Sequence, residues 1–278
     1  MQKPADSDGK DKADRDKACC LVTENGKQKT ENHILMNPLT PGEETMIGAL
    51  ARQVNDGDWA ACGTLSPMPA AALWLARLTH APRAEVFVAG SRDWPFEGEW
   101  RGFFDLAQTG RLNLFYLSGA QIDGQGNLNL MAVGDYRAPQ VRLPGGAGSA
   151  ILAYVVERVV LFKTAHEARG LVSRVDTVTA PGYTPDLSPW QRPGRITRLI
   201  TPRCVFAFDP PKPPLLESLH PGESLEEVRR LTGFDFRVPG PPAATPPLTP
   251  AARELLYGPV KEQLAQVYPH FAARLQLD

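Results

Sequence analysis

The chain has 278 residues, of which 42% are hydrophobic, and this is enough apolar material for one large α/β domain or two modest ones. Its 30 Lys and Arg residues nearly balance its 31 Asp and Glu residues, and the net charge of -1 gives no basis for binding nucleic acid or an anionic membrane. Residues 1–17 are charged and lack the apolar core of a secretory signal, and no apolar run is long enough to span a bilayer, so we predict a cytoplasmic protein.

The predicted elements of the first half alternate between strand and helix. Residues 1–37 mix charged and polar residues without apolar periodicity, which predicts a disordered charged tail. The folded body is predicted to begin near Thr40 with a helix whose first turn is acidic. Further patterns predict helices at residues 67–78 and 100–108 and strands at residues 58–63, 85–89 and 112–117. This alternation predicts a mainly parallel sheet covered by helices on both faces.

The second half adds more strands and a helical end. Strand patterns occur at residues 158–163, at residues 172–179 and, as a hairpin or a bent pair of strands, within residues 196–208. A capped helix is predicted from Ser224, and a proline-rich linker precedes a closing helix that either continues or breaks at Gly258 and Pro259. We therefore expect a domain of residues 38–238 and a segment of residues 239–278 that packs on it.

Cysteine and histidine form no ligand pattern in this sequence. The 4 cysteines show neither a disulfide framework nor a CxxC pair. His80 and His166 have no Cys, Asp or His neighbours at ligand spacing. We therefore predict no metal site.

Residues 118–150 are unusually rich in glycine, asparagine and small residues. They follow a predicted strand, and in an open parallel sheet ligands bind at the carboxyl ends of the strands. Gly145, Gly146, Ala147 and Gly148 offer backbone N–H groups without side chains in the way, which predicts a nest for an oxyanion or phosphate. The alternative is that these glycines serve tight chain reversal.

The polar residues of the same region have competing roles. Asn127 and Asn129 either bind a ligand or support the backbone, and Asp135 either orients a partner group or caps its own turn. Arg142 is expected to pair with a phosphate or a substrate carboxylate, because guanidinium donates two parallel hydrogen bonds. For Arg137 we favour an ion pair at the surface or at a subunit interface, and for Asp123 a capping role.

Two segments, GAQIDGQGNLN at residues 119–129 and VGDYRAPQVRLPGGAG at residues 133–148, resemble the hallmark region of the β subunit of family I CoA-transferases, of the glutaconate CoA-transferase type. Further motifs occur in the family order: CGT at residues 62–64, VDTVTAPGY at residues 175–183 and HPGESLEEVRRLTGFDF at residues 220–236. The resemblance covers about residues 40–240.

The resemblance implies a three-layer α/β fold with a mainly parallel sheet, of the CoA-transferase and sugar-phosphate isomerase-like type. It also implies an enzyme subunit that requires a CoA-transferase α subunit and acts on an acyl-CoA, with coenzyme A as part of the substrate and no other cofactor. We expect catalytic donors at Gly145, Gly146, Ala147 and Gly148. We expect substrate contacts from Gly119, Ala120, Gln121, Asn127, Asn129, Asp135 and Arg142.

In the transferases of this family, a glutamate at a strand end attacks the acyl-CoA carbonyl, and the resemblance places Ala89 at that position. Alanine cannot form the covalent intermediate, and Glu97 and Glu99 lie in a loop out of reach. A branch of the family that opens steroid rings by hydrolysing a cyclic β-keto acyl-CoA also lacks this glutamate. We therefore predict hydrolase-type chemistry in steroid degradation. The alternatives are a true CoA-transferase and a non-catalytic ligand-binding subunit.

Overall fold

The computed structural model describes residues 37–96, 100–183 and 192–276, so the tail predicted for residues 1–37 lies outside the described residues apart from Asn37. Residues from Pro38 onward form one compact unit. Its centre is an eight-stranded sheet with the strand order β12-β11-β10-β9-β8-β3-β1-β2. The strands are β1 (Trp59–Cys62), β2 (Glu85–Val88), β3 (Leu114–Leu117), β8 (Arg158–Phe162), β9 (Arg195–Ile200), β10 (Cys204–Ala207), β11 (Leu215–Leu219) and β12 (Ala243–Ala244).

The sheet is parallel on the side that carries the predicted site. β2, β1, β3, β8 and β9 pair in parallel, whereas β10 pairs antiparallel with both β9 and β11. The pairing of β9 with β10 confirms the hairpin predicted within residues 196–208. β3 is buried along its whole length, as its apolar run LFYL predicts for a strand covered on both faces.

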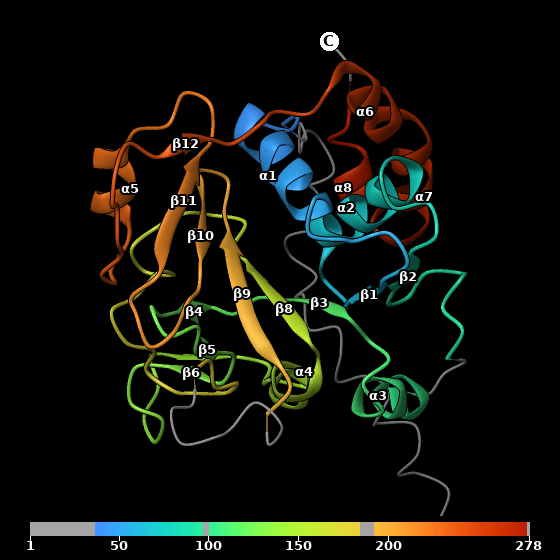
Figure 1. The fold of residues 1–278 in the computed structure, drawn as a ribbon. Coiled ribbons are helices and arrows are strands. Elements are labelled where there is room, and N and C mark those ends of the chain that lie inside the picture. The colour runs from blue at the N-terminus through green and yellow to red at the C-terminus, as the bar shows by residue number, and fades with distance from the viewer. Residues whose placement is uncertain (1–36, 97–99, 184–191, 277–278) are drawn as a thin grey trace, which may run out of the picture. The chain divides into compact units, whose positions relative to one another are not determined.

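Helices cover both faces of the sheet (Figure 1). One face carries α1, α2 and the C-terminal helices, and the other carries α3 and α4, each with its own hydrophobic cluster. The helices are α1 (Pro41–Ala51), α2 (Pro67–Leu78), α3 (Trp100–Gln108), α4 (Ser149–Val155), α5 (Leu225–Leu231), α6 (Pro250–Leu255), the π-helix η2 (Leu256–Val260), α7 (Lys261–Val267) and α8 (Pro269–Ala272). The protein therefore has a three-layer α/β fold with a mixed, mostly parallel sheet.

Helix starts follow the caps that the sequence provides. The hydroxyl of Thr40 accepts from the N–H of Glu43 at 3.2 Å, and the carboxylate of Glu43 accepts from the N–H of Thr40 at 2.8 Å, which closes a capping box. The closing helix is interrupted at Gly258, whose φ of -105° and ψ of -106° are not helical, next to Pro259. Among the described residues, no helix combines the length and apolar content needed to cross a bilayer.

The prediction of a strand at residues 172–179 is wrong. This segment forms only single bridges at its two ends, where Leu171 pairs with Ile122 and Ala180 pairs with Leu128. Between them the chain is irregular, because its polar side chains bind two neighbouring hairpins in place of a regular ladder. The first hairpin joins β4 (Gln121–Ile122) to β5 (Leu128–Asn129), and the second joins β6 (Ala132–Val133) to β7 (Val141–Arg142).

Candidate active site

The carboxyl ends of β2, β1, β3 and β8 lie side by side along one edge of the sheet, which we call the carboxyl edge. Cys62 of β1 is in register with Val88 of β2 and with Tyr116 of β3. Leu117 of β3 is in register with Leu161 of β8. The loops that leave these strands are therefore neighbours, which is the arrangement in which parallel sheets build ligand sites.

The glycine turn, residues 145–148, ends directly before α4. The N–H of Gly145 donates to the carbonyl of Leu130 at 2.9 Å, so this one amide of the predicted nest is already used. The N–H groups of Gly146, Ala147 and Gly148 have no protein acceptor among the described residues. Three adjacent amides of this kind suit a nest for negative charge, and their role as donors to an oxyanion stays a prediction.

Close packing fixes the position of the glycine turn. A Cβ atom at Gly148 would lie 2.1 Å from Cζ of Phe104 on α3, and one at Gly146 would lie 2.3 Å from Cγ2 of Thr179. The outer side of the turn opens into a hollow of about 440 Å³ that is lined by Phe104, Gln108, Ala147, Gly148 and other residues of α3 and α4. A side chain at either position would force a neighbouring group to shift, and the turn remains open on one side.

Lys163, which sequence reasoning did not assign to the site, holds the turn that follows β3. Its ammonium donates to the carbonyl of Gly119 at 2.9 Å and to that of Ala120 at 3.0 Å. Burial lowers the pKa of Lys163. The available sequence signal is a lysine that ends the otherwise apolar run VVLF, where the strand reaches the carboxyl edge. Gly119 and Ala120 therefore lie at the carboxyl edge as predicted, and their substrate contacts remain a prediction.

Gln121 and Asn129 are engaged inside the protein. Asn129 is fully buried, and its amide nitrogen donates to Gln121 Oε1 at 2.7 Å and to the carbonyl of Ala132 at 2.6 Å. Its amide oxygen accepts from the N–H groups of Met131 and Ala132. Gln121 in turn donates to Asp176 at 2.9 Å. With these bonds made, the two side chains support the backbone, and their substrate contacts stay a prediction.

Asp123 and Asn127 also support the backbone. Asp123 Oδ1 accepts from the N–H groups of Gln125 at 3.0 Å and Asn127 at 3.1 Å, which is the capping role predicted for it. Asn127 donates to Asp123 Oδ2 at 3.0 Å and accepts from the N–H of Gly182 at 2.9 Å. Of the two roles open for Asn127, the geometry favours backbone support.

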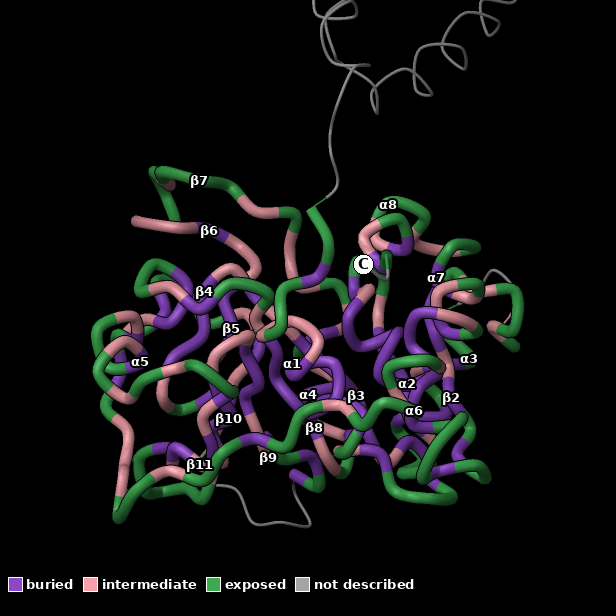
Figure 2. Tube along the Cα trace, turned by 90° about the horizontal axis from the view of Figure 1, so that it is seen from above, coloured by how far each residue is buried: buried purple, intermediate pink, exposed green. Residues whose placement is uncertain are grey.

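The hairpin of β6 and β7, which we call the arm, stands apart from the rest of the fold (Figure 2). Its tip carries Asp135, whose carboxylate accepts from the N–H of Arg137 at 2.7 Å. Arg142 lies 5.0 Å above the ring of Tyr136 and donates to the carbonyl of Tyr136 at 3.1 Å. Tyr136 and Val141 are 51% and 50% exposed. Asp135 and Arg142 thus lie on the exposed arm. The glycine turn is the segment that follows the arm in the sequence.

Ala89 directly follows β2 and is buried, and its N–H donates to the carbonyl of Cys62 at 3.2 Å. The segments that leave β1, β2 and β3, residues 63–66, 89–92 and 118–121, contain no Asp or Glu. Glu97 and Glu99 lie outside the described residues. These three segments therefore bring no carboxylate to the carboxyl edge, and the first acid after β2 is the exposed Asp93, four residues beyond Ala89.

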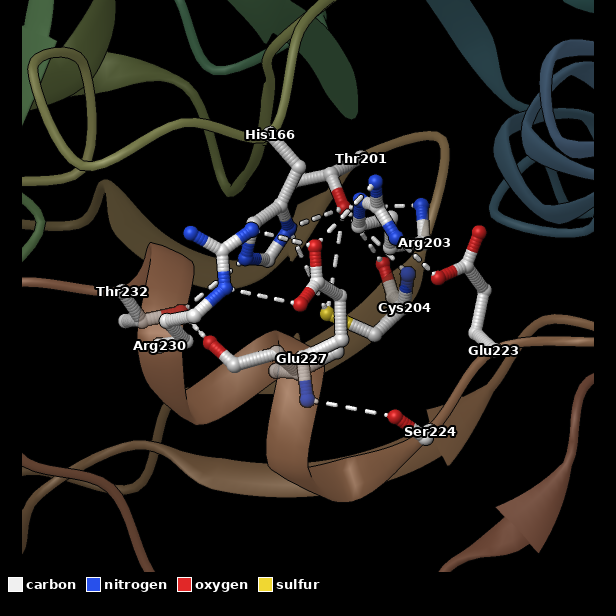
Figure 3. A network of polar contacts seen from close by, with 10 residues as sticks. His166, Thr201, Arg203, Cys204, Glu223, Ser224, Glu227, Arg230 and Thr232 are labelled. Carbon is white, nitrogen blue, oxygen red and sulfur yellow. Dashed lines mark hydrogen bonds and ion pairs between the residues drawn. The ribbon is translucent and has the colours of Figure 1, made fainter.

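A separate polar network ties the ends of β8, β9 and β10 to α5 (Figure 3). His166 Nδ1 lies 2.8 Å from the hydroxyl of Thr201, and its Nε2 lies 3.0 Å from the hydroxyl of Thr232. Arg203 pairs with Glu223 beside them. Both ring nitrogens of His166 are thus satisfied within the fold, and the network gives Thr232 of the TGFD motif and Glu223, which follows the HPG motif, a structural role.

Two buried histidines are expected to make the protein less stable at acid pH. Burial, with a smaller effect from the charge of Arg203, lowers the pKa of His166 to about 4, and burial also lowers the pKa of His220 to about 4. In the unfolded chain each pKa returns to near 6.5, so the unfolded state binds more protons below that pH. The stabilisation is complete above about pH 6.5, and about 1.4 kcal/mol is lost per pH unit below it for each histidine.

Urea unfolding at pH 7 and pH 5 measures this loss. A His166→Gln variant is the control, because glutamine does not titrate and its free energy of unfolding should depend less steeply on pH. Equal pH dependence in the two proteins would contradict this assignment.

The described residues include no group of three or more His, Cys, Asp or Glu side chains that could hold a metal ion. A cavity of about 750 Å³ lies away from the glycine turn, between the Asp123 turn and the Pro210 loop, and Tyr183 and Phe234 also line it. This cavity is larger than the hollow of about 440 Å³ beside the glycine turn, but none of the free amides of the glycine turn lines it. The carboxyl edge remains the better candidate site.

Curated relatives of this chain are subunits of CoA-transferases. Over 228 residues the chain is 27% identical to the β subunit of glutaconate CoA-transferase of Acidaminococcus fermentans, covering 70% of this chain and 84% of the relative. Over 220 residues it is 29% identical to the β subunit of 3-oxoadipate CoA-transferase of Pseudomonas knackmussii, covering 70% of this chain and 83% of the relative.

Solved structures share the fold. The decarboxylase AibA/AibB matches with a TM-score of 0.66 and 28% identity, over 83% of this chain and 95% of the other. Glutaconate coenzyme A-transferase from Acidaminococcus fermentans matches with a TM-score of 0.68 and 25% identity, over 86% and 98%. IpdAB of Rhodococcus jostii matches in fold, with a TM-score of 0.67 and 23% identity, over 79% and 94%. The family model of coenzyme A transferase matches residues 90–230, and the chain therefore belongs to the coenzyme A transferase family.

Proposed function

We propose that this chain is the β subunit of a two-subunit enzyme that acts on an acyl-CoA thioester and takes the other half of its active site from an α subunit. Both curated relatives are the β subunits of CoA-transferases, and the chain aligns with more than four fifths of each. The exposed apolar side chains of the arm, Tyr136 and Val141, support a partner, because a second subunit would remove them from water.

For the reaction we propose hydrolysis. The observation that carries this proposal is Ala89, which stands where the resemblance expects a nucleophilic glutamate, together with the absence of Asp and Glu from residues 63–66, 89–92 and 118–121. Without that carboxylate, the covalent route through this strand end is closed. Water activated by a base of the α subunit then attacks the thioester carbonyl, and the proton goes to that base. The C–S bond breaks, and coenzyme A leaves as a thiolate that takes up the proton from the base.

Besides a base, hydrolysis requires donors that stabilise the negative charge on the substrate oxygen, and the glycine turn supplies them. The amides of Gly146, Ala147 and Gly148 donate to the oxygen on which negative charge develops, and they need no rearrangement to do so. On a cyclic β-keto acyl-CoA, the substrate type that the sequence resemblance suggests, water attacks the ring ketone instead. The bond between the ketone carbon and the α carbon then breaks, and the α carbon takes up a proton from the base, so the ring opens to a carboxylate and the thioester stays intact. The proposal needs no metal and no cofactor beyond the coenzyme A of the substrate.

A true CoA-transferase is the second candidate. It is favoured by the names of the two curated relatives, each of which belongs to a CoA-transferase. In that case the attacking carboxylate would come from elsewhere in the assembled enzyme. AibA/AibB, a structural neighbour with 28% identity, is named a decarboxylase, so chemistry other than CoA transfer occurs among proteins similar to this chain.

The test uses the complex purified from the native cell through a tag on this chain. It is incubated with a panel of acyl-CoA thioesters, both with and without an acceptor such as acetate. We expect a second subunit in the complex and water-dependent conversion that acetate does not accelerate. If acetyl-CoA forms only when acetate is present, the enzyme is a CoA-transferase and the proposal of hydrolysis is wrong. A complex without a second chain would contradict the subunit assignment.

A further inference from the structure

The turn that follows β1 contains an unusual leucine. Leu65 has a φ of 59°, and among the described residues Leu65 and Ala147 are the non-glycine residues with positive φ. This left-handed conformation is strained for a bulky side chain, whereas glycine and asparagine adopt it readily. Leu65 is also 87% exposed, compared with 53% for Val178, the next most exposed large hydrophobic residue described.

Folding does not account for a leucine at this position. The side chain is almost entirely in solvent, so it adds little to the hydrophobic core. The turn around it is held by other groups: Tyr268 donates to the carbonyl of Gly63 and accepts from the N–H of Ser66, both at 3.4 Å. Ser66 then precedes α2, which begins at Pro67. The surrounding structure thus imposes a strained backbone and presents an apolar side chain outward, a combination that marks functional sites.

Leu65 lies in the middle of the carboxyl edge. β1 is placed between β2 and β3, so the turn after β1 is flanked by the end of β2, at Ala89, and by the turn after β3, at residues 118–120. The N–H of Ala89 donates directly to the carbonyl of Cys62, the last residue of β1. Leu65 therefore follows the central one of the three strand ends where the proposed reaction takes place.

We propose that Leu65 contacts the acyl group of the substrate and selects for acyl-CoA molecules with an extended apolar acyl portion. This inference rests on the proposed function, because it takes the carboxyl edge as the acyl-CoA site. An acyl group of this kind covers the exposed leucine when it binds, and burial of apolar surface on both sides favours it over a short acyl group.

The test compares binding of free CoA and octanoyl-CoA to the native complex by calorimetry. The variants are Leu65→Gly and Leu65→Asn, because both residues fit a positive φ and neither presents a hydrocarbon side chain. Leu78→Asn is the matched control, since Leu78 is another exposed leucine, 42% exposed, at the far end of α2. Thermal unfolding of each complex reports whether the turn is intact.

We expect the native complex to bind octanoyl-CoA more tightly than CoA, and this preference to fall by about tenfold in both Leu65 variants. The unfolding midpoint should stay unchanged or rise, because the strain is relieved, and Leu78→Asn should keep the preference. An unchanged preference in the Leu65 variants would overturn the inference while leaving the proposed function intact. Loss of the second subunit from these variants would also overturn it, because Leu65 would then be an interface residue. If the native complex binds neither CoA nor octanoyl-CoA, the proposed function fails and the inference falls with it.

Discussion

Replacing Gly148 with alanine is expected to lower the turnover of the assembled enzyme by about 100-fold or more, the size of effect that follows when a donor to a developing oxyanion is displaced. The added Cβ atom would lie 2.1 Å from Cζ of Phe104, far inside van der Waals contact. This contact is relieved by a shift of the Phe104 ring, of the turn or of both, and any shift of the turn takes its amides with it. The rate of acyl-CoA conversion by the native complex is the measurement.

Two further variants isolate this cause. Gly240→Ala is the matched control, because a Cβ atom at Gly240 meets no atom within 4 Å and its activity should not change. A Gly148→Ala/Phe104→Ala double variant should regain part of the lost activity, because removing the ring makes room for the new methyl group. Full activity in Gly148→Ala alone would show that the position of the glycine turn does not matter for the reaction.

Replacing Asn129 with alanine is expected to reduce the free energy of unfolding by about 3–5 kcal/mol, because several buried hydrogen-bonding groups lose their partner at once. The groups left without it are the carbonyl and N–H of Ala132, the N–H of Met131 and the side-chain oxygen of Gln121. The arm begins at Ala132, so its base should loosen as well. Urea unfolding of the purified protein measures the loss.

Gln125→Ala provides the comparison for Asn129→Ala. Gln125 lies in the same hairpin but is exposed, and its replacement should change the free energy of unfolding by no more than about 0.5 kcal/mol. If both variants lose less than about 1 kcal/mol, Asn129 is not the structural centre of this region.

The sequence predicts the layered part of the fold well because hydrophobic patterns there depend on local periodicity. The helices at residues 67–78 and 100–108 have the predicted bounds, and the strand at residues 85–89 differs by one residue. Residues 172–179 fail for a physical reason. Their alternation of apolar and polar residues resembles a strand, but Asp176 and Thr179 bind the backbone of neighbouring segments across a gap in the ladder.

The candidate site is less predictable, because sequence shows which polar groups are present but not which are already bonded. Asn129 and Gln121 look like ligand-binding residues beside glycines, yet the fold uses both internally. Lys163 and Leu65 were missed because the sequence does not mark them as site residues. Lys163 looks like the end of a buried strand, and Leu65 looks like an ordinary turn residue. The hydrogen bonds of Lys163 and the positive φ of Leu65 are visible only in the structure.

The most direct test of the central claim is the intact mass of this chain during turnover. The native complex is mixed with acyl-CoA, quenched in acid, and each subunit is weighed by mass spectrometry. We predict that this chain keeps its unmodified mass, because no carboxylate of its own attacks the thioester. A covalent adduct of coenzyme A or of the acyl group on this chain would contradict the account.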